Sequence, residues 1–223
     1  MKGIIFDMDG VLIDSEPQQI ESTIKVLDMF GIKTKADDFI KFMGMYNLQV
    51  MALFKQTYNL EVSPERMFEI QTNFMIKEVE NNFHLMPKFN EMAKELETLK
   101  NVKFAIASSS PRALVNAVIK KLGWEDFLSS SVTGDEVTTS KPSPEIYQKA
   151  ARVLNLDVKD CLVLEDSSNG MQSALDAGMA VVGFFPPNSE NKDFSKVRYK
   201  ISSLNEFPFS VNKFVNGEKM SSS

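Results

Sequence analysis

The sequence predicts a doubly wound α/β fold, in which helices cover both faces of a parallel sheet and a helical cap is inserted near the start of the chain. Three observations support this prediction. Short apolar runs typical of buried strands recur along the chain, and amphipathic helix patterns separate them. Directly after the first run comes the region 16–84, which contains helix patterns and almost no strand signals.

Four apolar runs are the predicted strands: GIIFD (3–7), VKFAIAS (102–108), CLVLED (161–166) and AVVGFF (180–185). Polar or Gly-containing turns bound each run, and none alternates strictly between apolar and polar residues. This pattern is expected of parallel strands that are buried on both faces. A second interpretation is open at this point, because IIFDMDGVLI is also compatible with a hairpin that turns at Asp9-Gly10.

Helix patterns fill the intervals between these runs, over residues 88–100, 111–123, 143–156 and 167–178. In the second segment Leu114, Val118 and Leu122 share one face of the predicted helix. Gly123 is the expected end of that helix, because glycine readily adopts the left-handed conformation of a C-cap.

The region 16–84 is predicted to be a helical cap. Ile20, Ile24 and Leu27 lie at helical spacing, and Ser63 is a typical N-cap in front of Pro64. We therefore divide the chain into an α/β core domain of residues 1–15 and 85–210, a cap of residues 16–84, and a disordered tail of residues 211–223.

Composition and charge argue against several classes of function. The net charge is −5, and no basic cluster is present that would neutralise nucleic-acid phosphates. No apolar stretch is long enough to cross a bilayer, and Asp7, Asp9 and Asp14 interrupt the apolar segment that a signal peptide would need. The single Cys161 excludes an intramolecular disulfide and is expected to be a small buried hydrophobe. We expect a cytoplasmic monomer with no nucleic-acid or membrane partner.

Carboxylates follow two of the predicted strands. Asp7 and Asp9 come at the end of the first run, and Glu165 and Asp166 at the end of the third. Ligands of open α/β sheets bind at the carboxyl ends of the strands, and carboxylates crowded there must take up a proton or find a cation. Oxygen donors from two neighbouring strand ends suit Mg²⁺. The sequence therefore predicts a magnesium site at these four acids, whereas the hairpin interpretation leaves the second pair unexplained.

Two further segments offer groups for a phosphate. ASSSPR places Ser108 and Ser109 at the end of the second predicted strand, just before a helix start that would attract an anion. TSKPSPEIY places Lys141 before another helix. Taken singly, serines in front of a helix are often only caps, and a lone lysine is usually a solvated surface charge. Together with the carboxylates they describe one pocket for a phosphate and a divalent ion.

In these four motifs the chain resembles the haloacid dehalogenase-like hydrolases, in the branch that includes β-phosphoglucomutase and the small sugar-phosphate phosphatases. DMDGV is similar to the family's first motif, Ser108 to the second, SKPSPEIY to the third and LEDSSNG to the fourth, in the family's order. The helical insert lies where this branch carries its cap. The resemblance covers residues 2–185 and implies a Rossmann-like core.

The resemblance implies roles for the four acids. Asp7 would be the nucleophile that forms an aspartyl-phosphate. Asp9 would act as general acid and then as general base, and would offer the metal only its backbone carbonyl. Asp166 would bind Mg²⁺ together with Asp7, and Glu165 would bind it directly or through water.

The resemblance also implies how the phosphate is held. Ser108 and Lys141 would bind the transferring phosphoryl oxygens, with Ser109 beside them. Gly10 would let the chain turn sharply and present an N–H to the phosphate. The helical cap would close over the pocket and exclude bulk water.

One departure from the mutase pattern favours a phosphatase. The related mutases carry a cap Arg that grips a second phosphate, whereas the stretch FMGMYNLQ (42–49) has Asn47 near that place and no Arg precedes Arg66. We therefore expect a Mg²⁺-dependent phosphatase for a small phosphorylated metabolite, a sugar phosphate above all. A β-phosphoglucomutase-type phosphomutase is the second interpretation, and a non-catalytic phosphate-binding module is the third. His84, at the junction of cap and core, is expected to be structural.

Overall fold

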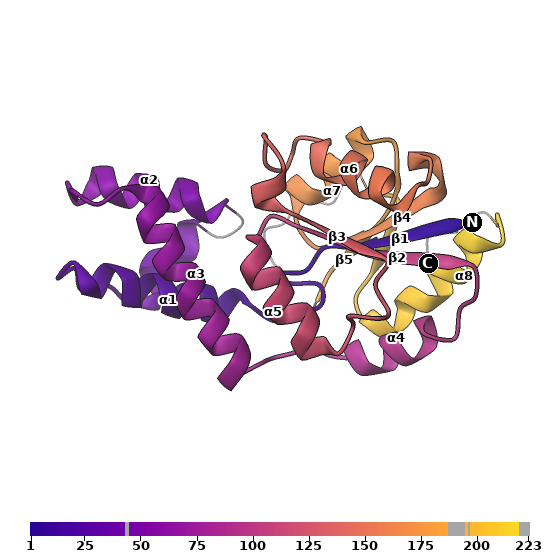
Figure 1. Ribbon diagram of the computed structural model, residues 1–223, viewed down its shortest axis with the longest axis horizontal. Helices are drawn as coiled ribbons and strands as arrows, with labels where there is room; N and C mark the ends of the chain where they lie inside the picture. Colours follow the sequence, from indigo (N-terminus) through magenta and orange to yellow (C-terminus); the bar gives the residue numbers. More distant parts are fainter. Residues whose placement is uncertain (43–44, 187–194, 196, 219–223) are drawn as a thin grey trace.

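Six parallel strands form one sheet within the described residues, which are 1–42, 45–186, 195 and 197–218 of the computed structural model. The strands are β1 (Lys2–Phe6), β2 (Val102–Ser108), β3 (Ser130–Thr133), β4 (Cys161–Glu165), β5 (Ala180–Phe184) and β6 (Tyr199–Ile201). Their order across the sheet is β3-β2-β1-β4-β5-β6, so β1 lies in the interior of the sheet between β2 and β4 (Figure 1). The predicted parallel α/β sheet is confirmed.

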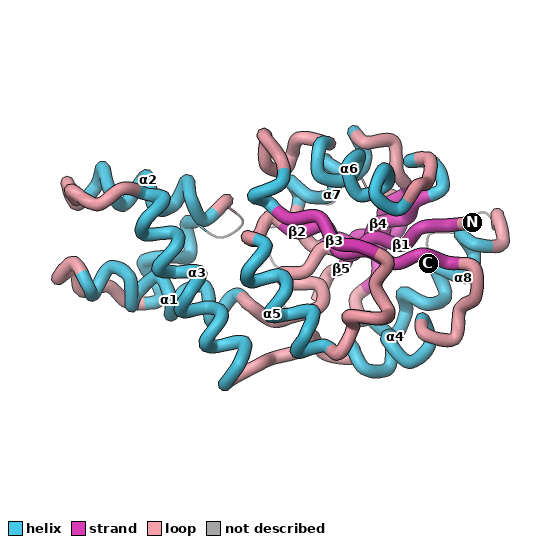
Figure 2. The backbone as a smooth tube through the Cα atoms, in the orientation of Figure 1, coloured by secondary structure: helices cyan, strands magenta, loops and turns pink. Residues whose placement is uncertain are grey.

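Helices cover both faces of this sheet (Figure 2). One face carries α4 (Phe89–Leu96), α5 (Arg112–Leu122) and α8 (Phe207–Val215), and the other carries α6 (Glu145–Leu154) and α7 (Ser168–Asp176). Alternating side chains of each strand serve the two layers, as the pleat of a strand requires. In β1, Ile4 and Phe6 pack into the first layer and Ile5 packs into the second.

The first predicted strand continues into a loop and not into a hairpin. Phe6 is aligned with Ile106 of β2 and with Leu164 of β4. The Asp7 N–H donates to the carbonyl oxygen of Leu164 at 3.0 Å, which extends the pairing to the start of the loop. Both edges of β1 are thus occupied by parallel neighbours, and the alternative hairpin at Asp9-Gly10 is wrong.

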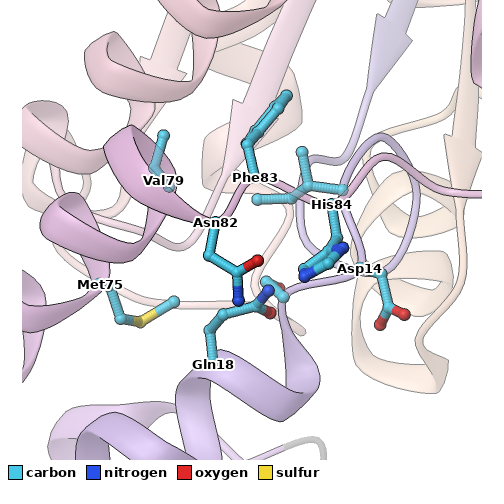
Figure 3. Close-up of a pocket in the computed structure, with 9 residues that line it drawn as sticks. Asp14, Gln18, Met75, Val79, Asn82, Phe83 and His84 are labelled. Carbon is cyan, nitrogen blue, oxygen red and sulfur yellow. The ribbon is translucent and has the colours of Figure 1, made fainter.

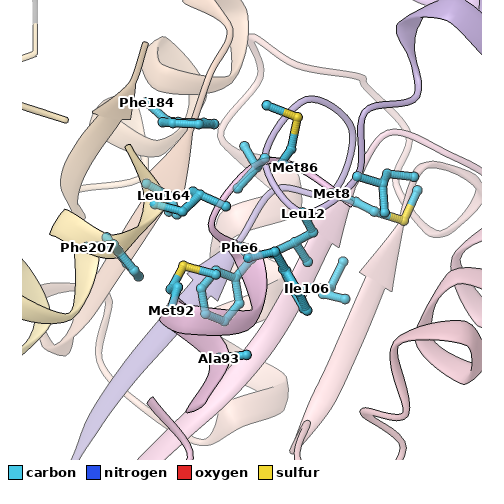
Figure 4. Packing of buried hydrophobic residues seen from close by; sticks show 14 of the residues in the cluster. Phe6, Met8, Leu12, Met86, Met92, Ala93, Ile106, Leu164, Phe184 and Phe207 are labelled. Atoms are coloured by element: carbon cyan, nitrogen blue, oxygen red, sulfur yellow. The ribbon is translucent and has the colours of Figure 1, made fainter. Parts of the chain in front are cut away.

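Buried apolar side chains hold the loop that follows β1. Met8, Val11 and Leu12 are fully buried, and Figure 4 shows Met8 and Leu12 in the same cluster as Phe6. The Leu12 N–H also donates to the Met8 carbonyl oxygen at 2.9 Å. Burial of each large side chain contributes roughly 1.5–3 kcal/mol. The loop that carries the first acidic motif is therefore part of the hydrophobic core.

The segment between β1 and α4 is helical, as predicted. It consists of α1 (Glu16–Met29), the 3₁₀ turn η1 (Ala36–Phe42), α2 (Asn47–Thr57) and α3 (Pro64–Asn81), which share a hydrophobic cluster of their own (Figure 1). Ser63 caps α3 as predicted, because its side chain accepts a hydrogen bond from the Arg66 N–H at 3.2 Å. Met75 and Val79, further along α3, pack into the core cluster and join the two parts.

The structure departs from the predicted elements in three places. β3 and β6 were not predicted, because SSVT and YKI are too short and too polar to give a clear apolar run. The tail predicted to begin at residue 211 begins later, because α8 continues to Val215 and buries Val211 completely against the core. Residues 219–223 of that predicted tail lie outside the described residues.

Two further predictions from the sequence are confirmed, namely the end of the helix at Gly123 and the burial of Cys161. α5 ends at Gly123, which adopts the left-handed conformation with φ of 69°. The Cys161 side chain is fully buried in the layer that contains Ile5. Burial raises the pKa of the Cys161 thiol to about 11.

We predict that the Cys161 thiol does not react with a thiol reagent in the native protein, because a buried thiol with a raised pKa offers almost no thiolate. Titration with dithiobis(nitrobenzoate) at about pH 8 should show no fast phase in buffer, and one equivalent per chain in denaturant, since the chain has a single cysteine. Rapid reaction of the folded protein would show that the strand is more open than described.

Candidate active site

Three carboxylates meet where β1 and β4 end. Asp7 follows β1, Glu165 is the last residue of β4, and Asp166 follows it. Oxygen atoms of the three side chains all lie within 4.8 Å of one another, and all three residues are buried. The strand order explains this arrangement, because β1 and β4 are neighbours and run in the same direction. The predicted convergence of the two acidic motifs is therefore present.

Lys141 lies among these acids. Its ammonium donates to Asp7 Oδ1 at 2.6 Å and to Glu165 Oε1 at 2.7 Å, and it also contacts the carbonyl oxygen of Ala107 at 3.1 Å. Only 7% of the Lys141 side chain is exposed, so this lysine is not the solvated surface charge that remained possible from the sequence. Lys141 is brought to the acids from a loop 134 residues away from Asp7 in the sequence.

Burial and charge act on these groups in opposite directions. Burial raises the pKa of Asp7 well above its usual value, and the charges of Glu165 and Asp166 add to that increase although Lys141 opposes it. For Lys141, burial disfavours the ammonium, but Asp7 and Glu165 outweigh it and raise its pKa well above the usual value. For Glu165, burial disfavours the carboxylate, but Lys141 together with hydrogen bonds from Ser167 and Tyr147 lowers the pKa below its usual value. One ammonium therefore faces more negative charge than it balances.

The donor set fits a divalent cation of the magnesium type. Asp7, Glu165 and Asp166 offer carboxylate oxygens only, which are the ligands that hard cations prefer. A doubly charged cation would offset the repulsion that a single ammonium leaves uncompensated. Asp9 is not part of this group, in agreement with the expectation that its side chain stays away from the metal.

The Asp9 carboxylate is bound on the other side of the loop. Its Oδ1 accepts a hydrogen bond from Ser15 Oγ at 2.7 Å and one from Gln19 Nε2 at 3.4 Å. Its Oδ2 accepts from Ser110 Oγ at 2.9 Å and from Ser108 Oγ at 3.4 Å. Gln19 belongs to α1, so a helix of the cap contacts this acid directly. Asp9 and Ser108 were predicted from the sequence, whereas Ser15, Gln19 and Ser110 were not.

The serines after β2 differ in their contacts. Ser108 is fully buried, and its Oγ accepts a hydrogen bond from the Ser110 N–H at 3.0 Å. Ser110, and not Ser109, sends its side chain to Asp9. The role of Ser109 in phosphate binding stays a prediction. A signal for Ser110 was present in the sequence, because a run of three serines allows any of them to cap or to contact an acid.

Two glycines make room for the acids. Gly10 has a φ of +77°, as predicted for a sharp turn, and a Cβ there would lie 2.5 Å from Asp166 Oδ2. Gly170, in the first turn of α7, lies so close to Glu165 that a Cβ would overlap its carboxylate. The Asp166 and Glu165 side chains therefore occupy space that only glycine leaves open. Gly170 was not predicted as a site residue, although it lies within the motif LEDSSNG.

Tyr147 and Ser167 complete the surroundings of Glu165. The Tyr147 hydroxyl lies 2.9 Å from Glu165 Oε1, and the Ser167 N–H and Oγ lie 2.9 Å and 3.0 Å from Glu165 Oε2. Neither residue was identified from the sequence. Tyr147 stands six residues after Lys141 in the quoted motif, but its position alone does not distinguish a polar contact from core packing.

His84 lies apart from these groups. It lines a cavity of about 20 Å³ where the two chain segments between cap and core run side by side, together with Asp14, Gln18 and Asn82 (Figure 3). The His84 carbonyl oxygen accepts a hydrogen bond from the Asp14 N–H at 3.0 Å. This position agrees with the predicted structural role at the junction.

Among the described residues, no helix has the length and apolar character needed to span a bilayer.

A capped α/β sheet with carboxylates and a lysine at the ends of its strands defines a class of hydrolases. Residues 4–184 match the family model described as haloacid dehalogenase-like hydrolase. Because this match covers more than half of the chain, the chain belongs to that family. The family predicted from the four motifs is confirmed.

Relatives of similar length are named phosphatases. The phosphorylated carbohydrates phosphatase of Thermotoga maritima is 30% identical over 183 residues, which are 80% of this chain and 82% of the relative. Hexitol phosphatase B of Escherichia coli is 30% identical over 206 residues, 91% of this chain and 92% of the relative. Protein SUPPRESSOR OF QUENCHING 1, chloroplastic, of Arabidopsis thaliana is 31% identical over 188 residues, but the chain spans only 18% of its length. The predicted enzyme class, a phosphoric monoester hydrolase, agrees with these phosphatase names.

Solved structures share the fold. CbbY of Rhodobacter sphaeroides, in complex with phosphate, superimposes with a TM-score of 0.84 at 20% identity, over 93% of this chain and 96% of that one. A β-phosphoglucomutase of Clostridium difficile superimposes with a TM-score of 0.79 at 24% identity, over 97% and 98% of the two chains. At these identities the likeness concerns the fold, including the inserted helical cap.

We predict that Mg²⁺ stabilises the folded protein, because a cation that binds only the native cluster shifts the unfolding equilibrium. At a Mg²⁺ concentration of a hundred times the Kd, the free energy of unfolding would increase by about 2.7 kcal/mol. Differential scanning fluorimetry with increasing MgCl₂ should show a rising Tm, and EDTA should reverse it. Asp166→Asn should abolish the rise, whereas Asp14→Asn, a change at an exposed acid outside the cluster, should leave it intact. If the Tm of the unaltered protein does not change with Mg²⁺ concentration, the predicted metal site is contradicted.

We predict that Gly170→Ala displaces Glu165 and lowers any Mg²⁺-dependent activity at least tenfold, because the added methyl group occupies the space of the carboxylate. Overpacking of this kind costs about 1–3 kcal/mol of stability. Gly123→Ala is the matched control. It imposes backbone strain of about 1 kcal/mol at a positive φ without touching any neighbour within 4 Å, and should leave activity unchanged. Urea unfolding and steady-state rates of both variants test this, and equal activities would contradict it.

Proposed function

We propose that this protein is a Mg²⁺-dependent phosphatase that hydrolyses a small phosphorylated metabolite, a sugar phosphate above all, through an aspartyl-phosphate. One observation carries the proposal: the carboxylates of Asp7 and Asp166 converge on the same point as the Lys141 ammonium, at the carboxyl edge of the sheet. A nucleophile, a metal ligand and a cation for phosphoryl oxygens are thus brought together within one buried cluster.

In the first half of the reaction a carboxylate oxygen of Asp7 attacks phosphorus in line with the bond to the leaving group. The P–O bond to the leaving alcohol breaks, and Asp9 gives its proton to the departing oxygen. In the second half Asp9 takes a proton from a water molecule, whose oxygen attacks the phosphorus. The bond between Asp7 and phosphorus breaks, and inorganic phosphate leaves with both residues restored.

The surroundings of Asp9 support this division of roles. Asp9 is two residues from Asp7, but its carboxylate is bound by Ser15 and Ser110 and not by Lys141. It is therefore kept out of the carboxylate cluster, at the side where Gln19 of the cap approaches. A general acid must stand on the leaving-group side of the phosphorus, and the cap is the part of this chain that would cover the leaving group.

Asp7 and Asp166 would hold Mg²⁺, with Glu165 as a direct or water-linked ligand and the Asp9 backbone carbonyl as a further donor. When bound, the ion would neutralise charge on the phosphoryl oxygens and on the acids around them. Ser108, Ser109 and Lys141 would bind the remaining phosphoryl oxygens, and Gly10 would offer its N–H. The charge of Lys141 also reduces the repulsion between Asp7 and an anionic substrate.

The cap supports a phosphatase more than a mutase. Asn47, near the place where the related mutases are expected to carry an Arg, begins α2. Arg66, the first Arg of the chain, is paired with Glu69 at 2.6 Å. Residues 43–44 of the quoted cap stretch lie outside the described residues. Two relatives are named as phosphatases of phosphorylated carbohydrates and of hexitols, which supports a sugar phosphate as the substrate here. The likeness to a β-phosphoglucomutase fold keeps the mutase as the second candidate.

The proposal is tested by phosphate release from a panel of sugar and polyol monophosphates, with Mg²⁺ and with EDTA. We expect release from at least one compound in the presence of Mg²⁺ only. Interconversion of hexose 1- and 6-phosphates that is faster than net release would favour the mutase. If no compound shows metal-dependent phosphate release or interconversion, both the phosphatase and the mutase are contradicted. The expectations of a monomer and of a cytoplasmic location stay predictions.

Asp7→Asn should reduce turnover to background, because an amide oxygen neither attacks phosphorus effectively nor leaves as a carboxylate. Asp9→Asn should lower kcat about 10²–10⁴-fold, the range of general acid–base catalysis. Asp14→Asn serves as control, because this exposed acid contacts the junction of cap and core and not the cluster. Far-ultraviolet circular dichroism should confirm that all three variants fold. Asp7→Asn with full turnover would disprove the assignment of the nucleophile.

A further inference from the structure

Tyr147 is a buried polar residue for which the reaction above has no role. It lies in α6, six residues after Lys141, and its side chain is fully buried. Its hydroxyl lies 2.9 Å from Glu165 Oε1 and 3.1 Å from Lys141 Nζ. The Lys141 ammonium also lies over the Tyr147 ring, 4.8 Å from its centroid. One side chain thus contacts both members of the buried ion pair at the site.

The groups around the Tyr147 hydroxyl determine to which neighbour it donates and from which it accepts a hydrogen bond. Glu165 Oε1 accepts from Lys141 and Tyr147, and Oε2 accepts twice from Ser167. The Lys141 ammonium has N–H donors and no acceptor, whereas the Glu165 carboxylate accepts only. The Tyr147 hydrogen therefore points to Glu165, and the hydroxyl oxygen accepts from the Lys141 ammonium.

The Tyr147 hydroxyl is one of four acceptors around the Lys141 ammonium, which is almost completely buried. An ammonium has three N–H donors and rotates freely about its last bond unless acceptors define its direction. Asp7, Glu165, the Ala107 carbonyl and the Tyr147 hydroxyl lie within 3.1 Å of its nitrogen. Of these, the tyrosine is the only neutral side chain. It holds the ammonium in place without adding negative charge to a site that already has an excess.

We propose that the Tyr147 hydroxyl is a positioning group that fixes the Lys141 ammonium and the Glu165 carboxylate relative to each other, and thereby strengthens phosphate binding. The inference rests on the proposed function, because it assigns Lys141 to the phosphoryl oxygens. Tyr147 itself does not touch the substrate: it is fully buried beneath Lys141 and acts through that residue.

The competing explanation is that Tyr147 only fills the core. Its ring does pack in the layer with Ile5, Val163 and Ile146, and that contribution depends on the ring and not on the hydroxyl. Tyr147→Phe separates the two explanations, because it keeps the ring and removes only the hydroxyl oxygen. In the variant, Glu165 Oε1 loses one of its two donors, and the Lys141 ammonium keeps three of its four acceptors, at a place with little access to water.

The experiment is isothermal titration calorimetry of inorganic phosphate into the full-length protein at saturating Mg²⁺. We expect Tyr147→Phe to raise the Kd for phosphate about tenfold, as for loss of a hydrogen bond to a charged group. The same variant should show a raised KM for the substrate found in the panel, together with a smaller fall in kcat. Tyr58→Phe, at a tyrosine that is 39% exposed in the cap, is the control and should match the unaltered protein.

Urea unfolding of both variants separates positioning from packing. A Tyr147→Phe variant with nearly unchanged stability and weaker phosphate binding supports the proposal. A variant that binds phosphate as tightly as the unaltered protein overturns it, whatever its stability. An unaltered protein that hydrolyses none of the monophosphates and binds no phosphate overturns the proposed function, and this inference with it. If the unaltered protein binds phosphate and Tyr147→Phe binds it with the same Kd, only the inference about Tyr147 is overturned.

Discussion

The feature on which the whole site depends is the crowding of Asp7, Glu165 and Asp166 around the single ammonium of Lys141. Like charges at this distance in a buried place repel strongly, and the raised pKa of Asp7 reflects its burial first and then this repulsion. Such an arrangement persists only when the surrounding structure holds it. Here the neighbouring strands β1 and β4 carry the acids, and the hydrophobic core on both faces of the sheet keeps those strands in register.

Each part of the site has a separate support. The loop after β1 is anchored by fully buried residues such as Met8 and Leu12, so the first acidic motif is held as firmly as the core itself. Gly10 and Gly170 leave the space that the carboxylates of Asp166 and Glu165 occupy. These supports contain no proposed catalytic group, yet they determine where the acids stand.

The cap and the core meet at the general acid that we propose. Asp9 and Ser15 belong to the core, but Gln19, in α1 of the cap, also donates to the Asp9 carboxylate. The cluster of Asp7, Asp166 and Lys141 lies in the core alone. The carboxylates and the ammonium that would bind the metal and the phosphoryl group thus belong to the core, whereas the proposed general acid is also contacted by the cap. This separation agrees with a family in which the same fold is found in relatives named for different phosphorylated compounds.

The sequence by itself determined the interior strands, the helices between them, the cap and the acids at the strand ends, because these depend on local periodicity and on residue type at an element's end. Ser63 and Gly123 behaved as their local signals indicated. Only the tertiary structure decided which side chains meet: Tyr147 with Glu165, Ser110 and Gln19 with Asp9, and Val211 with the core. The physical reason is that such contacts depend on the packing of segments far apart in the sequence, and no local pattern records which neighbour a buried polar side chain will find.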